Sequence, residues 1–105
     1  MKIQFNTDHN LDGDERNEQY FSTEIEKGLK RFQTYITRVE VHLSDENGKK
    51  DIGDDKSCLL EVRLEGKQPV VVTAKANTVS KAVAGAVDKM SAALDTIVGK
   101  MHNKH

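Results

Sequence analysis

The stretch that decides the fold is residues 69–101, PVVVTAKANTVSKAVAGAVDKMSAALDTIVGKM. It begins with an extended, largely apolar run that ends at Ala76. After a short break at Asn77, Thr78 is placed to cap a helix, because its hydroxyl can accept a hydrogen bond from a backbone N–H of the first turn. The stretch therefore predicts a strand over residues 70–76, followed by one long helix that ends near Met101.

The predicted helix has a single apolar stripe, formed by residues that recur at steps of three and four. Its members are Val79, Val83, Val87, Met90, Leu94, Ile97 and Met101. A helix of about 24 residues is roughly 36 Å long, so its stripe needs a broad platform beneath it. We expect the upstream strands to supply that platform.

The opposite side of this helix is smooth and basic. At 100° per residue, its solvent arc holds Lys81, Gly85, Lys89, Ala92, Thr96, Gly99 and Lys100, with Asp88 and Asp95 at the edge. Small side chains allow phosphates to come near, and ammonium groups displace counterions from a polyanion. An ordinary solvated helix face has the same composition, so both interpretations stay open.

Another helix, the first in chain order, is predicted to begin near Asp14. Its buried stripe consists of Phe21, Ile25, Leu29 and Phe32, followed by Ile36. Its opposite arc again gathers cations, namely Arg16, Lys27, Lys30 and Arg31, together with Tyr20 and Thr23. Two helices thus each present a basic side, which is less easily explained by chance than one.

Alternation of apolar and polar residues predicts the other strands, at residues 2–6, 38–43 and 58–65. His42 is expected to face outward, and residues 44–56 to form a mobile connection. The order is β-α-β-β-β-α in a single domain over residues 1–105. The strands on either side of the first helix should be parallel neighbours. We therefore predict an α+β two-layer sandwich, with a four-stranded mixed sheet and two parallel helices on one face.

Groups for catalysis are few. The sequence has no glycine-rich phosphate loop, Gly-x-Ser-x-Gly turn or Cys-x-x-Cys pair, so we expect no enzyme, cofactor or small-molecule substrate. His102 and His105 lack a third ligand, so no metal is expected. Cys58 is predicted to be a buried, inert thiol. A lone cysteine favours a reducing compartment, and no apolar run reaches 18 residues, so we expect a cytoplasmic protein without a membrane span.

The charge is uneven along the chain, although the formal net charge is only -1. Residues 1–62 carry 9 Lys and Arg against 14 Asp and Glu, whereas residues 63–105 carry 7 against 3. An unspecific nucleic-acid binder is usually basic overall, and this chain is not. Any contact with nucleic acid must therefore come from local basic surfaces.

One run resembles a known family. V-x-x-T-A-x-A-N-T-V-x-x-A-V-x-G-A-V-D-K-M-x-x-x-L, which begins at Val70, is similar to the last strand and helix of the ribosome hibernation promoting factors. This family includes ribosome-associated inhibitor A and the sigma-54 modulation proteins. The passage from Leu29 through Ile36 to Leu43 also resembles the family in its spacing. Together with the element order, the resemblance covers about ninety residues.

The resemblance implies a translation inhibitor of dormant ribosomes whose partner is the small subunit and its 16S rRNA. In this family, basic residues of both helices face ribosomal RNA. By position, Lys89 is the best-matched cation, and Lys27, Lys30 and Arg31 fall in the corresponding basic helix. Our own strand and helix geometry adds Lys75, Lys81 and Lys100. The complete set of expected RNA-binding residues is Lys27, Lys30, Arg31, Lys75, Lys81, Lys89 and Lys100.

The chain also departs from the family pattern. Ala92 and Ala93 stand where the family usually has Arg and Gln, and Thr78 and Ser80 where it has an acidic and an aromatic residue. A protein that neutralises fewer phosphates binds RNA more weakly and with a smaller salt dependence. The alternative is thus a divergent domain of the same fold that binds a protein and no longer binds ribosomes. The sequence assigns no oligomeric state.

Overall fold

The computed structural model describes residues 1–8, 15–45 and 56–102. Its elements in chain order are β1 (Lys2–Thr7), α1 (Glu15–Leu29), the 3₁₀ turn η1 (Lys30–Phe32), β2 (Ile36–Asp45), β3 (Lys56–Leu64), β4 (Val70–Ala76) and α2 (Val79–His102). The predicted order of strands and helices is confirmed.

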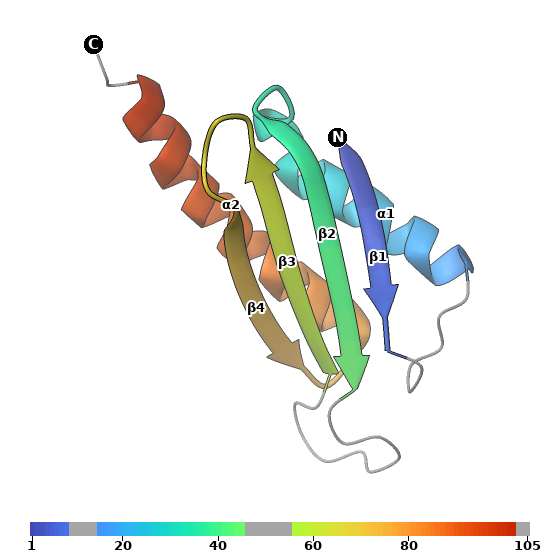
Figure 1. Cartoon of the computed structure of the whole chain (residues 1–105). Helices are drawn as coiled ribbons and strands as arrows, with labels where there is room; N and C mark the ends of the chain where they lie inside the picture. Colours follow the sequence, from blue (N-terminus) through green and yellow to red (C-terminus); the bar gives the residue numbers. More distant parts are fainter. Residues whose placement is uncertain (9–14, 46–55, 103–105) are drawn as a thin grey trace.

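The four strands form one sheet in the order β1-β2-β3-β4. β1 runs parallel to β2, as a strand pair joined by a helix requires, and the other neighbours are antiparallel. Both helices cover the same face of the sheet and run in the same general direction (Figure 1). The predicted α+β two-layer architecture is therefore correct, and it leaves the other face of the sheet uncovered.

The core lies between the sheet and the two helices. Alternating residues of β2 and β3 face inward, and the apolar stripes of both helices are buried against them. Within α2, Val83, Met90 and Leu94 are almost completely buried, whereas Ile97 near its end is only half-buried. The last turns of α2 extend beyond the sheet, which explains this difference (Figure 1).

The ends of two predicted elements differ from expectation. The first helix closes in a 3₁₀ turn that still buries Phe32, and Ile36 already belongs to β2. β2 is longer than the predicted residues 38–43 because it pairs with β3 along its whole length, from Ile36 to Asp45. Asp45 and Lys56, predicted to lie in the connection, form an ion pair of 3.3 Å at the strand ends. Of the predicted connection, residues 46–55 lie outside the described residues, as does Asp14.

Two local contacts position the helices. The Lys81 backbone N–H donates to Oγ1 of Thr78 at 3.1 Å, so Thr78 caps α2 as predicted. At the crossing of the helices, a Cβ atom on Gly28 would lie only 2.2 Å from Cγ1 of Val87. Glycine at position 28 therefore allows the two helices to approach more closely than any other residue would.

Candidate nucleic-acid interface

The lysines of α2 are exposed, and one of them bonds to the neighbouring strand. The Lys89 ammonium group donates a hydrogen bond of 2.7 Å to the carbonyl oxygen of Thr73 in β4, so Lys89 reaches toward the edge of the sheet. Gly85 is also on this side. The prediction that it lies on the solvent arc is wrong, because it is half-buried and a Cβ there would be 3.2 Å from the Ala74 Cβ. The physical reason is that α2 lies against β4.

The lysines of α1 and η1 are both exposed and close together. Lys27 and Lys30 line a shallow depression of about 320 Å³ with Thr23, Glu26 and Gln33. Lys27 Nζ is also 3.8 Å from Glu24 Oε2, an exposed pair one helical turn apart. Such pairs contribute little to stability and exchange readily with solvent or a ligand.

Arg31 has a different environment from the lysines. Its guanidinium group donates to both carboxylate oxygens of Asp95, at 2.6 and 2.7 Å, and to Ser91 Oγ at 3.0 Å. It also lies 4.5 Å from the centre of the Phe32 ring. Arg31 therefore connects η1 to α2 and can bind phosphate only by releasing Asp95. This pairing joins residues 64 positions apart, which no sequence spacing reveals.

Lys75 is separated from the helix lysines by the sheet. It is exposed, and it lies between Ala74 and Ala76, whose side chains are turned to the helix side of β4. Alternation along a strand then places Lys75 on the uncovered face. Of the predicted cations, the structure thus brings Lys27, Lys30 and Arg31 together at the end of α1 and in η1, and it places Lys75 on the other face of the sheet.

A groove between the helices was not apparent from the sequence. It has a volume of about 340 Å³ and is lined by Tyr20, Phe21, Glu24, Lys27, Gly28, Ser80, Val83, Ala84, Val87 and Asp88. A carboxylate stands on each helix, Glu24 on α1 and Asp88 on α2. In the sequence, Glu24 and Asp88 belong to two separate predicted helices, so only the packing of the helices could bring them to one groove.

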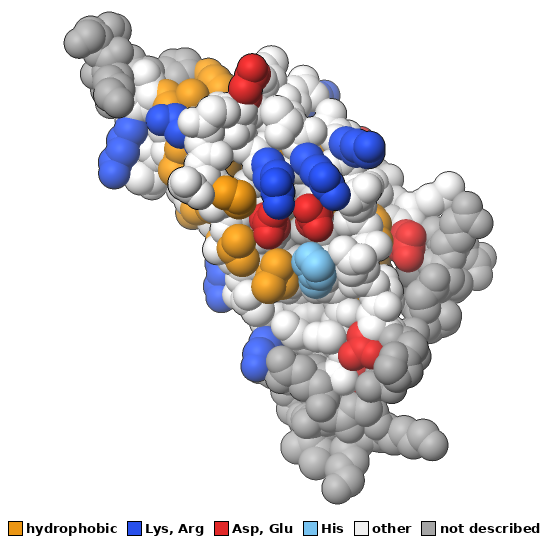
Figure 2. Space-filling model, viewed as in Figure 1, with side chains coloured by type: hydrophobic (Ala, Val, Ile, Leu, Met, Phe, Trp, Pro, Cys, Tyr) orange, Lys and Arg blue, Asp and Glu red, His pale blue; other side chains and the backbone are white. Residues whose placement is uncertain are grey.

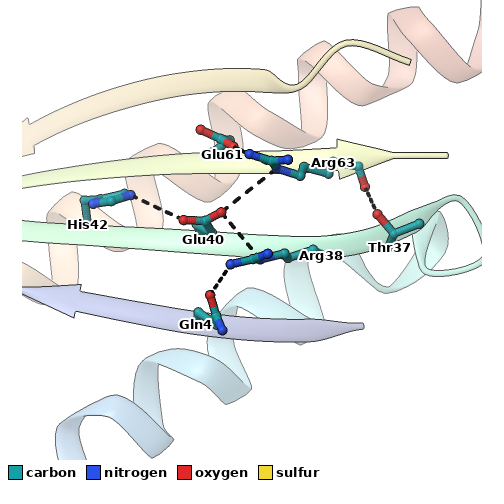
Figure 3. Close-up of polar contacts among 7 residues, drawn as sticks. All are labelled: Gln4, Thr37, Arg38, Glu40, His42, Glu61 and Arg63. Carbon is teal, nitrogen blue, oxygen red and sulfur yellow. Dashed lines mark hydrogen bonds and ion pairs between the residues drawn. The ribbon is translucent and has the colours of Figure 1, made fainter. Parts of the chain in front are cut away.

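The uncovered face of the sheet carries a network of charges that the sequence also did not reveal (Figure 2). Arg38 is paired in register with Arg63, and Glu40 with Glu61. Like charges on neighbouring strands repel each other, but here the arginine pair lies beside the glutamate pair and the two neutralise each other (Figure 3). Glu40 lies 3.4 Å from Arg38 and 4.0 Å from both Arg63 and His42, and Glu61 lies 3.0 Å from Arg63.

This network is a balanced surface. Arg38 also donates a hydrogen bond to Gln4 of β1, which links three strands (Figure 3). Because the carboxylates occupy the guanidinium groups, the face offers few free charges for a phosphate backbone. The sequence predicted that His42 faces outward, but only the register shows which of the charged residues pair.

Other candidate chemistry is sparse in the described residues. No three His, Cys, Asp or Glu side chains of this part of the chain gather to hold a metal ion. None of its helices combines the length and the apolar character that a membrane crossing requires. Cys58 is fully buried, and burial raises the pKa of its thiol to about 12, so it is the inert thiol that was predicted.

The fold and this surface define an α+β domain that exposes lysines on a layer of two helices. Residues 5–102 match the family described as Sigma 54 modulation protein / S30EA ribosomal protein, and the chain belongs to this family. The predicted family is thus confirmed.

Two solved structures have the same fold. The N-terminal domain of Protein Y from Thermus thermophilus is 23% identical with a TM-score of 0.67, over 92% of this chain and 99% of that one. A ribosomal subunit interface protein from Coxiella burnetii is 19% identical with a TM-score of 0.70, over 94% and 99%. No curated protein matches the sequence.

Proposed function

We propose that this protein is a non-enzymatic factor that binds the small ribosomal subunit, contacts 16S rRNA through its helix layer and inhibits translation in dormant cells. The observation that carries the proposal is the family match, which spans residues 5–102 and so includes both helices. The likeness to the Coxiella burnetii protein, which is described as a ribosomal subunit interface protein, supports it. A cytoplasmic location follows from the proposal.

The cations best placed for this contact are those that no other group holds. Lys30, Lys81 and Lys100 are exposed, and their ammonium groups have no partner among the described residues. Lys27 has only the weak pair with Glu24. Arg31 and Lys89 remain candidates, but they must first release Asp95 and the Thr73 carbonyl. Each phosphate contact formed releases counterions, which makes the binding dependent on salt.

Sedimentation with isolated small subunits at increasing salt tests the proposal. We expect the wild type to co-sediment at low salt. The double variant Lys30→Glu with Lys81→Glu should bind more weakly and with a shallower dependence on salt, by about one unit of logarithmic slope for each phosphate that the variant no longer neutralises. Both positions are exposed, so folding should be unaffected.

The matched control reverses the charge at two exposed lysines that lie away from the helix layer. Lys2→Glu with Lys67→Glu changes the net charge equally, on β1 and on the β3–β4 turn. It should reduce binding much less than the helix variant. An equal decrease in both variants, or no co-sedimentation of the wild type, would contradict the proposed helix interface.

One observation favours the alternative, a protein-binding domain of this fold. Glu24, Asp88 and Asp95 stand among the cations of the helix layer, so the positive charge is interrupted. Salt separates the two functions, because an apolar protein interface persists where a phosphate-dominated complex dissociates. A partner that is retained from native lysate at high salt, and that is not a ribosomal subunit, would favour this alternative.

A further inference from the structure

We propose that the groove between α1 and α2 binds a single unpaired nucleobase with hydrogen-bond donors on its edge, and that guanine fits best. This inference rests on the proposed function, because it states how RNA would meet the helix layer. The groove volume of about 340 Å³ is at the small end of the range for ligand sites, which suits one base and not a larger ligand.

The first observation is an aromatic ring in the wall of the groove. Tyr20 is 53% exposed, which makes it the most exposed large apolar side chain of the described residues. It meets Phe21 edge to face, with 5.5 Å between ring centres and 69° between planes, and this contact restrains the ring. Exposed aromatic rings are the usual stacking partners of unpaired bases.

The second observation is the pair of carboxylates on opposite walls. Glu24 and Asp88 would repel a phosphate group, but they accept hydrogen bonds from the N–H groups of a base. Guanine presents N1–H and the N2 amino group side by side, so it can donate two parallel bonds to one carboxylate. Uracil presents a single N–H between two carbonyl oxygens, which a carboxylate repels. The groove should therefore prefer guanine over uracil.

The remaining lining fits the same ligand. Val87 forms the apolar floor of the groove where it packs against Gly28, and the small, exposed Ala84 leaves the α2 wall open to a flat ligand. Lys27 lies in the lining beside Glu24, where its ammonium group can meet the phosphate next to the bound base. The acidic groove and the neighbouring lysine thus have different roles, one toward the base and one toward the backbone.

Two short RNAs, UUGUU and UUUUU, test the proposal directly. Each is titrated with the protein at low salt, and binding is followed by fluorescence anisotropy and by NMR of the labelled protein. We expect tighter binding of UUGUU, with resonance shifts at Tyr20 and Ala84. Tyr20→Ala should weaken the binding of UUGUU by about 5- to 160-fold, the range of one base stack, and Tyr20→Phe should retain it. Ala84→Trp fills the groove from the other wall at an exposed position, so it should also abolish the preference for guanine.

The double variant Glu24→Gln with Asp88→Asn separates recognition from simple repulsion. If the carboxylates only repel RNA, neutralising them will strengthen the binding of both oligomers equally. If they read the base, the variant will gain affinity for UUUUU and lose the preference for UUGUU. The proposal is overturned if the wild type shows no preference for guanine, or if the preference survives in this variant.

The base site and the proposed ribosome binding can fail separately. A wild type that co-sediments with small subunits but shows no groove shifts with UUGUU refutes the base site and leaves ribosome binding intact. A wild type that binds UUGUU in the groove but does not co-sediment supports the base site and removes the small subunit as partner.

Discussion

The close approach of the two helices at Gly28 makes a quantitative prediction. Replacing Gly28 with Ala places a Cβ atom 2.2 Å from Val87 Cγ1, far inside any permitted contact. Valine in a helix has one strongly preferred rotamer, so its methyl group cannot easily turn away and the helices must separate. Overpacking of this kind costs about 1–3 kcal/mol, whereas exchanging glycine for alanine in a helix gains up to about 1 kcal/mol. We expect a net destabilisation of about 1–2 kcal/mol.

Thermal and urea unfolding followed by circular dichroism measure this change. For a domain of this size, the destabilisation corresponds to a decrease in Tm of roughly 5–15 °C. Gly99→Ala is the matched control, because it is the same exchange in α2 with no atom within 4 Å of the new Cβ, and it should raise stability by about 0.5 kcal/mol. Val87→Ala should restore part of the stability in the Gly28→Ala background. A Gly28→Ala protein as stable as the wild type would refute the reasoning.

Three further outcomes are expected. A double-mutant cycle on Arg31→Ala and Asp95→Ala should give a coupling energy below about 1 kcal/mol, since both side chains are more than half exposed; a much larger value would show that the pair is buried in solution. Thr78→Ala should lower the free energy of unfolding by about 1 kcal/mol through removal of the helix cap, and Thr78→Ser should retain it. Folding raises the pKa of the Cys58 thiol from 9.0 to about 12, so the folded state favours the protonated thiol. The stability that this preference contributes is complete below pH 9 and is lost as the pH rises toward 12. The stability difference between wild type and Cys58→Ala should shrink over that pH range, and a constant difference would contradict a buried thiol.

The mixed charge of the helix layer has a consequence for ribosome binding. Arg31 is held by Asp95, Lys27 faces Glu24, and Lys89 is bound to the edge of β4. The proposed RNA contact therefore depends on few free lysines, which predicts a weaker salt dependence than that of a strongly basic protein. Specific recognition of a base in the groove would compensate for this smaller electrostatic attraction.

The element order and the core were readable from the sequence because both follow from local periodicity. The stripe from Val83 to Leu94, the alternation around Val41 and the cap at Thr78 depend on residues a few positions apart, and a half-buried helix or strand must show such patterns. The family resemblance was readable for a related reason, since its longest run, residues 70–94, falls on one strand and one helix.

The surfaces were not readable, because each depends on which elements become neighbours. Periodicity placed Gly85 on the solvent side of α2, but β4 lies against that flank of the helix. Lys89 is exposed as predicted, yet its hydrogen bond to the Thr73 carbonyl could not be read from the sequence. In the sequence, Arg31 and Asp95 each resembled a free surface charge, whereas the packing of η1 against α2 pairs them. A helical pattern gives the direction of a side chain from its own axis, whereas the partner in that direction is set only when sheet and helices pack into one core.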